Sequence, residues 1–204
     1  MSARLTLGAV GALAGLAALS SPGSRAVRRT KDGGWSDHDK WRSPTYRPPN
    51  PPWQPEFRSW FRGSKVVEVG GDPRIVYHGT SAEFSRFDLG RTGERSPGAR
   101  LAGPAAYFSD SMVLARGYGD VQGGRVIAAW LRIEDPHEVD AQGGDWRDWV
   151  PQAVRRAQAS GKDGAIIRNV RDYPRHWYSH ISANVYVVFD ADQVWMAESP
   201  GGPR

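Results

Sequence analysis

The side chains of this chain that could do chemistry are imidazoles, phenols and carboxylates, because its 204 residues include no cysteine. The absence of thiols excludes disulfides, zinc–thiolate sites and a cysteine nucleophile, and it leaves the redox compartment open. Histidines and carboxylates do not cluster at metal-ligand spacing, so the sequence predicts no metal. The remaining candidates are His78, in the segment 77–80 (YHGT), and two tyrosines eleven positions apart, Tyr107 and Tyr118. Taken singly, each of the three could also be an ordinary packed residue.

Short strands are expected to position these side chains. Glycine (24 residues) and proline (15 residues) are both frequent, which favours short strands and turns over a helical bundle. Runs of β-branched and aromatic residues predict strands at 74–78, 105–109, 125–133, 164–169 and 184–190. This pattern indicates an α+β domain with a mostly antiparallel or split sheet.

Two helices are predicted between these strands. Asp110 is a plausible N-cap for a helix that runs through residues 112–118. The second helix covers 148–160, with Asp148 as its cap, Pro151 in its first turn and Gly161 as the residue that closes it.

Five segments in order carry a resemblance to a known family. They are 57–67 with 71–80 (FRSWFRGSKVV and GDPRIVYHGT), 103–110 with Tyr118 (GPAAYFSD), 133–140 (IEDPHEVD), 163–167 (DGAII) and 185–194 (VYVVFDADQV). Together they resemble the ADP-ribosyltransferase domains of phage and mobile-element polyvalent proteins, which are related to the diphtheria toxin and poly(ADP-ribose) polymerase branch. The resemblance covers about two-thirds of the chain. It implies an α+β fold with a split, mainly antiparallel sheet, few helices and an extended N-terminal arm before it.

The resemblance also implies a site for NAD, used as a substrate, and no metal. His78 and Tyr107 are the implied catalytic residues, and the His78 ring is expected to hydrogen-bond a ribose hydroxyl of NAD. The backbone of Gly79 is expected to contact the nicotinamide amide, with its missing side chain leaving room for the ligand. Tyr107 and Tyr118 are expected to stack on the two faces of the nicotinamide ring. The remaining implied cofactor-binding residues are Thr80 and Ser109.

The chemistry gives these positions a purpose. ADP-ribosyl transfer breaks the bond between nicotinamide and ribose through a transition state with positive charge on the sugar, as in glycoside hydrolysis. Nicotinamide leaves as a neutral base, so an enzyme of this class mainly orients the dinucleotide and stabilises that charge. The imidazole of His78 and the phenol of Tyr107 are therefore expected to meet across one groove.

Two positions depart from the family pattern. Ala105 stands where the tyrosine block has its second glycine, and Val185 stands where many members carry a catalytic glutamate. Members of the polymerase branch with an apolar residue there are generally mono-ADP-ribosyltransferases or inactive, so polymer synthesis is not expected. Asn184 or Ser182 could supply a polar group only through a one-residue slip of the strand, which turns each side chain to the other face.

The chain divides into a leader (1–23), a basic, proline-rich linker or arm (24–56), the ADP-ribosyltransferase-like domain (57–197) and a flexible tail (198–204). Residues 1–62 contain ten Lys or Arg and four Asp or Glu, so the positive charge lies in the arm. A basic arm fits contact with nucleic acid, an anionic membrane or other virion proteins, or it is a solvated leader. The uncharged run 5–19 is short for a membrane span and fits an export signal, a transit peptide or a helix docked on a partner.

Three functions follow as hypotheses. The first is an NAD-dependent mono-ADP-ribosyltransferase of a bacterium or phage that modifies a protein or nucleic-acid acceptor. The second is a catalytically silent member of the fold that serves as a structural or injected component of a phage particle. The third is an exported, toxin-like effector, for which the leader would have to be cleaved. The sequence identifies neither the acceptor nor the oligomeric state.

Overall fold

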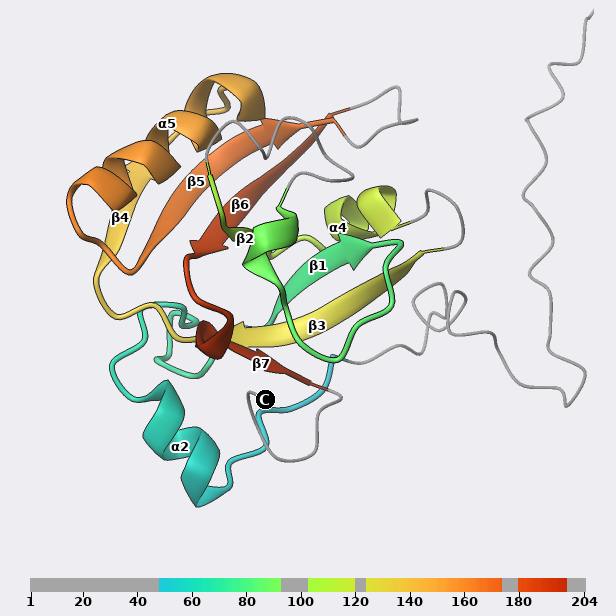
Figure 1. Ribbon diagram of the computed structural model, residues 1–204, viewed down its shortest axis with the longest axis vertical. Coiled ribbons are helices and arrows are strands. Elements are labelled where there is room, and N and C mark those ends of the chain that lie inside the picture. The colour runs from blue at the N-terminus through green and yellow to red at the C-terminus, as the bar shows by residue number, and fades with distance from the viewer. Residues whose placement is uncertain (1–47, 93–102, 120–123, 174–179, 198–204) are drawn as a thin grey trace, which may run out of the picture.

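The structure is a computed structural model that describes residues 48–92, 103–119, 124–173 and 180–197 (Figure 1). The leader 1–23, the arm up to residue 47, and the tail lie outside these residues. The helices are α2 (Pro55–Phe61), α4 (Met112–Gly119) and α5 (Trp146–Ala159), with short 3-10 helices η1 (Leu89–Arg91) and η2 (Ala191–Gln193). The strands are β1 (Val76–Thr80), β2 (Ala106–Ser109), β3 (Arg125–Leu131), β4 (Pro136–Asp140), β5 (Gly164–Asp172), β6 (Ile181–Val188) and β7 (Val194–Met196).

The seven strands form one sheet in the order β4-β5-β6-β2-β1-β3-β7. Every neighbouring pair is antiparallel except β4 and β5, which are parallel. The junction between β1 and β2 rests on the single pair Tyr77↔Ser109, whereas β1 pairs with β3 over five positions and β2 with β6 over four. The sheet is therefore split at this junction, and the predicted α+β fold class is confirmed.

The helices and the irregular segments cover opposite faces of this sheet. Alternate residues of each strand point to opposite faces, so the hydrophobic clusters show which face each element covers. On one face, α5 packs on Val185 and Val187, α4 packs on Tyr77 and Val126, and α2 packs on Trp130. We call this the helical face. The other face packs against residues 84–91 and the segment around Ala191, and we call it the loop face.

A bulge interrupts the pairing of β5 with β6. Ile167 lies opposite Val185, but Val170 lies opposite Ala183, so β5 holds one extra residue between these two pairs. Asn169 occupies the bulge with a φ of 53°, a left-handed conformation that asparagine tolerates better than most residues. Its side chain donates to both carboxylate oxygens of Asp140, and its backbone N–H donates to the side-chain oxygen of Asn184.

The five predicted strands and two predicted helices are all present, with shifted ends, but both predicted caps are wrong. Asp145, not Asp148, caps α5 by accepting a hydrogen bond from the backbone of Arg147. Ser111, not Asp110, precedes α4 and accepts from the Leu114 N–H. In each case a second polar residue near the start of the helix competes for the cap, and local sequence does not separate the two. Pro151 lies one turn later than expected, and Gly161 closes α5 with a φ of 66°, as predicted.

Three elements were not expected from the sequence: α2, β4 and β7. The helix α2 begins at a proline directly after the proline-rich stretch, and its buried face consists of Phe57 and Phe61. None of the helices in the described part of the chain is long and apolar enough to span a bilayer.

Candidate functional site

His78 lies in β1 with its ring on the loop face. Its Nδ1 is 2.8 Å from the backbone oxygen of Tyr107, and because a carbonyl can only accept, Nδ1 carries the proton. Its ring lies 5.0 Å from that of Phe87 and 5.5 Å from that of Phe108. Burial lowers the pKa of His78 below its ordinary value, and the bond to the carbonyl only partly opposes this. The ring is therefore neutral at neutral pH, with Nε2 as an acceptor.

Tyr107 lies in β2 with its ring on the helical face. It packs with the cluster of α5, and its ring is 5.9 Å from that of Trp146 in the first turn of that helix. Burial raises the pKa of the Tyr107 phenol. Ser109, two residues later, points to the same face, where its hydroxyl accepts the Ser111 N–H.

Tyr118 extends from α4 to the far end of β5. Its hydroxyl lies 2.8 and 2.9 Å from the two carboxylate oxygens of Asp172, the last residue of that strand. Asp172 shares the helical face with Val170, which belongs to the cluster packed under α5. Tyr107 and Tyr118 therefore lie on one face of the sheet, one beside the start of α5 and the other at the end of α4.

His78 and Tyr107 do not meet through their side chains. The His78 ring packs against Phe108, and Phe108 and Tyr107 are neighbours in β2 whose side chains point to opposite faces. The expectation that the imidazole and the phenol face one groove is therefore wrong. The two residues are joined instead through the backbone carbonyl of Tyr107, which fixes the orientation of the imidazole.

Gly79 and Thr80 have local structural roles in β1. A Cβ atom on Gly79 would lie 1.7 Å from the backbone oxygen of Ala115. The missing side chain therefore makes room for α4, rather than leaving space for a ligand on that side. The Thr80 hydroxyl accepts the Ala82 N–H at the turn after the strand.

The register of β6 places Val185 on the same face as the tyrosines. Val185 is opposite Ser109 and is buried in the cluster under α5. Its neighbour Asn184 points to the other face, where its side-chain N–H₂ and its backbone N–H both donate to the carboxylate of Asp110. Ser182 is exposed and lies opposite Arg171. Neither polar neighbour replaces the missing glutamate, in agreement with the sequence argument against a slip.

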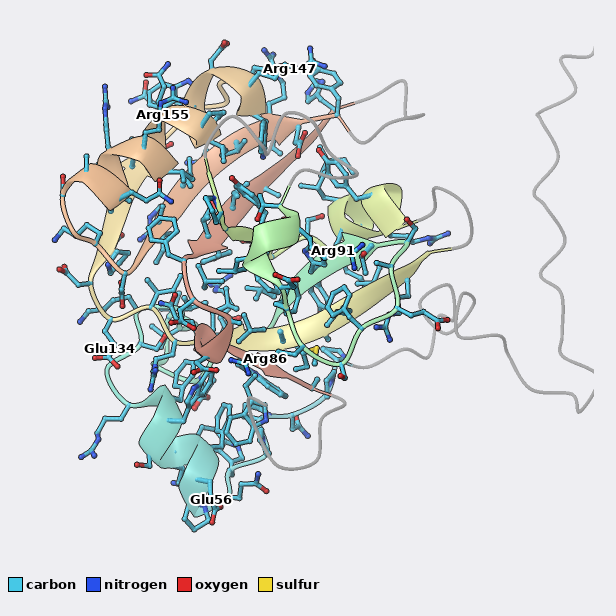
Figure 2. The ribbon with its side chains drawn as sticks, in the orientation of Figure 1. Glu56, Arg86, Arg91, Glu134, Arg147 and Arg155 are labelled. Atoms are coloured by element: carbon cyan, nitrogen blue, oxygen red, sulfur yellow. The ribbon has the colours of Figure 1, made fainter. Side chains whose placement is uncertain are left out.

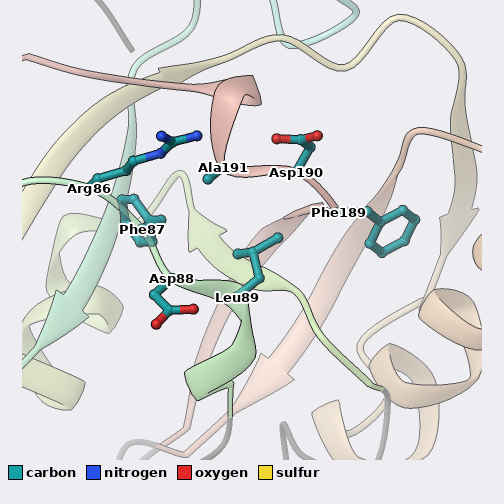
Figure 3. A pocket seen from close by; sticks show the side chains of 7 residues that line it. All are labelled: Arg86, Phe87, Asp88, Leu89, Phe189, Asp190 and Ala191. Atoms are coloured by element: carbon teal, nitrogen blue, oxygen red, sulfur yellow. The ribbon is translucent and has the colours of Figure 1, made fainter. Parts of the chain in front are cut away.

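Two surface hollows adjoin Phe189 and Asp190 after β6. The first lies between residues 86–89 and residues 189–191, and Figure 3 shows the residues that line it: Arg86, Phe87, Asp88, Leu89, Phe189, Asp190 and Ala191. Phe87 is shared between this hollow and the His78 ring. The second is lined by Arg132, Glu134, Asp163, Phe189, Asp190 and Gln193.

Sequence reasoning missed Trp146 and Asp172. Trp146 stands next to a helix cap that was assigned three residues too late, so its contact with Tyr107 was not expected. Asp172 lies beyond the bulge, where a simple alternating pattern assigns the wrong face. Figure 2 shows Arg147 at the starting end of α5, which lies beside the end of β5 through the bridge Asp145↔Arg171. No group of three or more potential metal ligands gathers within the described ranges, and the expectation of no metal stays a prediction.

Residues 68–201 match the family described as ADP-ribosyltransferase in polyvalent proteins. No curated protein and no solved structure matches the chain. The matched range contains all seven strands, His78 and both tyrosines, and it leaves out α2.

Proposed function

We propose that the chain transfers one ADP-ribose group from NAD to a protein or nucleic-acid acceptor. The premise is its family: the chain belongs to the ADP-ribosyltransferases in polyvalent proteins. In this reaction the bond between the nicotinamide nitrogen and C1′ of its ribose breaks, and the electron pair leaves with nicotinamide. The nucleophile of the acceptor forms the new bond to C1′ and loses its proton to solvent.

The observation that carries the proposal is the placement of Tyr107 and Tyr118 on one face of the sheet, next to the split between β1 and β2. Flat aromatic rings of this kind suit a planar ring such as nicotinamide. Trp146 supports Tyr107 from the start of α5, and the carboxylate of Asp172 holds Tyr118. These contacts fix both tyrosine side chains before a ligand arrives.

His78 supports the proposal from the other face. Its proton is held on Nδ1 by a backbone carbonyl, and Nε2 makes no hydrogen bond to the described residues. A neutral Nε2 accepts a hydrogen bond from a hydroxyl group, which is what a ribose offers.

The product is proposed to be a single ADP-ribose rather than a polymer. Val185 occupies the position on β6 that faces the tyrosine side, and it offers no carboxylate to a sugar hydroxyl. Stabilisation of positive charge on the ribose would have to come from the other groups around the site, so the reaction is proposed to be slow.

The test is to incubate the full chain with NAD labelled in the adenosine part, together with protein and nucleic-acid acceptors. Label on the acceptor and free nicotinamide are both measured. The His78→Ala variant is expected to lower the rate by about 100-fold, the effect of losing one preorganised hydrogen bond. His137→Asn, four strands away in β4, is the matched control and is expected to keep the wild-type rate. Absence of both products at millimolar NAD, with a folded wild-type chain, would refute transferase activity.

A second candidate is a binding protein that keeps the fold without catalysis. Two observations favour it: Val185 in the glutamate position, and the rings of Phe84 and Phe87 packed on the ring of His78. Calorimetry separates the two candidates. If NAD binds with a measurable heat and no nicotinamide is released, the result supports the silent form. If nicotinamide is also released, the result supports the transferase.

A further inference from the structure

The pair formed by Tyr118 and Asp172 joins two elements far apart in the sequence. Asp172 is 6% exposed, and its carboxylate receives the Tyr118 hydroxyl and the Tyr173 N–H, the latter at 2.7 Å. Two charged side chains near the start of α5, Asp145 and Arg147, act electrostatically on the pair. Within the described residues Arg147 forms no ion pair with Asp172, and it acts on the carboxylate only at longer range.

A carboxylate in this position is costly for the fold. Burial raises the pKa of Asp172, and the two donated hydrogen bonds only partly offset it. A hydroxyl and a single N–H are weak compensation for a buried charge, and no cation among the described residues forms an ion pair with it. Groups kept at such a cost cluster at functional sites, and this one holds a tyrosine of the proposed site.

We propose that Asp172 is a positioning residue that, through Tyr118, makes the site select the cationic nicotinamide ring of oxidised NAD over the neutral ring of reduced NADH. This inference rests on the proposed function, because it takes the stacking of Tyr118 on nicotinamide from there. The reaction itself consumes the oxidised form, and the inference adds the residue that discriminates between the two forms of the ring.

The physical basis is the direction of the hydrogen bond. The Tyr118 hydroxyl donates to the carboxylate, which increases the electron density of the phenol ring. A more negative ring face attracts a cation placed over it more strongly. The Asp172 carboxylate also adds a negative charge to the site, where Val185 supplies none. The oxidised ring carries a positive charge and the reduced ring does not, so only the oxidised form gains from both effects.

The experiment measures the dissociation constants of NAD and NADH for the full chain by calorimetry. The two nucleotides differ in the charge and saturation of the nicotinamide ring, so the ratio of the constants isolates the ring. We expect the wild type to bind NAD about ten-fold more tightly than NADH, the scale of a partly desolvated cation–π contact. Asp172→Asn keeps the size of the side chain and is expected to bring the ratio close to one, mostly by weakening NAD.

Two further variants complete the design. Tyr118→Phe removes the hydroxyl and is expected to lower the ratio as Asp172→Asn does, and the double variant is expected to be no worse than either single one. Asp192→Asn removes an exposed carboxylate that pairs with Arg86, away from β5, and it is expected to keep the wild-type ratio. A cooperative unfolding transition checks that each variant is folded.

The outcomes separate the inference from the function on which it rests. If Asp172→Asn weakens NAD and NADH by the same factor, or leaves the ratio unchanged, Asp172 has only a structural role and the inference is overturned. If the folded wild type binds neither nucleotide, the proposed NAD site is wrong, and the selection proposed for it is wrong with it.

Discussion

The proton of His78 is placed by a backbone carbonyl rather than by a carboxylate. The Tyr107 oxygen accepts from Nδ1, so the tautomer follows from the course of β2 and does not depend on another side chain that titrates. The aromatic rings around the imidazole disfavour its charged form. At the scale of single residues, the site therefore keeps a neutral hydrogen-bond acceptor over the physiological pH range.

This arrangement predicts how stability depends on pH. The folded pKa of His78 lies below its ordinary value of 6.5, so the unfolded chain binds more protons in the interval between the two values. The contribution of His78 to the free energy of unfolding is fully present above pH 6.5. It is lost as the pH falls through the lowered pKa of the folded state. Unfolding free energies measured from pH 7.5 to 5 should therefore decline, and in His78→Asn this part of the decline should be absent. If the free energy of unfolding declines equally steeply in the wild type and in His78→Asn, the pKa of His78 is not lowered by folding.

At the scale of elements, the close contact between α4 and β1 decides where Tyr118 can reach. Gly79 permits this contact, since the Ala115 carbonyl occupies the position of a side chain, and Gly119 makes a similar approach to the backbone of Arg125. The helix is consequently held against the strand that carries His78, and its last turn directs Tyr118 toward Asp172. A glycine expected to leave room for a ligand thus leaves room for a helix.

Substitution of Gly79 tests this contact. Gly79→Ala is expected to lower the free energy of unfolding by about 3 kcal/mol or more, because the new methyl group meets backbone rather than a side chain that can turn away. Gly70→Ala is the matched control, since nothing lies within 4 Å of its added Cβ atom, and it should stay within about 0.5 kcal/mol of wild type. Chemical denaturation of both variants gives the comparison. A Gly79→Ala protein as stable as Gly70→Ala would show that α4 does not pack as described.

Sequence patterns predicted the sheet better than the site. The β-branched runs of β3, β5 and β6 are long and bounded by turn residues, so these strands could be found without tertiary information. The strand β4 could not, because PHEVD alternates weakly and begins with proline. The contacts of Tyr118 with Asp172 and of Tyr107 with Trp146 were missed because they depend on the packing of α4 and α5 against the sheet. The face of each side chain near the split was missed because a single residue of offset changes it.

At the scale of the whole molecule, α2 extends the domain beyond the range that matches the family. Phe57 is fully buried, with its ring 5.4 Å from that of Trp130 in β3 and 5.2 Å from that of Trp195 in β7. The helix thus covers the end of the sheet farthest from β4 and β5, and Trp60 donates to the backbone of Asp192 from the same helix. Part of the segment that leads into the domain is therefore a component of its core.

A substitution in α2 tests that view. Phe57→Ala in the full chain is expected to cost about 3–5 kcal/mol of stability, because it leaves a cavity among the tryptophans. Trp53→Ala, at a ring that is 41% exposed, is the control and should cost far less. Thermal unfolding followed by tryptophan fluorescence reports on both. Similar midpoints for Phe57→Ala and wild type would mean that the helix is not docked.

The extra residue in β5 determines the sign of the charge that Tyr118 meets. With the bulge at Asn169, Ile181 lies opposite Asp172, and Arg171 points the other way. If the two strands instead kept the register of Ile167 and Val185 along their whole length, without a bulge, Arg171 would lie opposite Ile181. A guanidinium would then stand beside the phenol and repel the pyridinium ring that the carboxylate attracts. The preference of the proposed site between an oxidised and a reduced dinucleotide would in this way depend on a one-residue insertion in β5 that touches neither nucleotide.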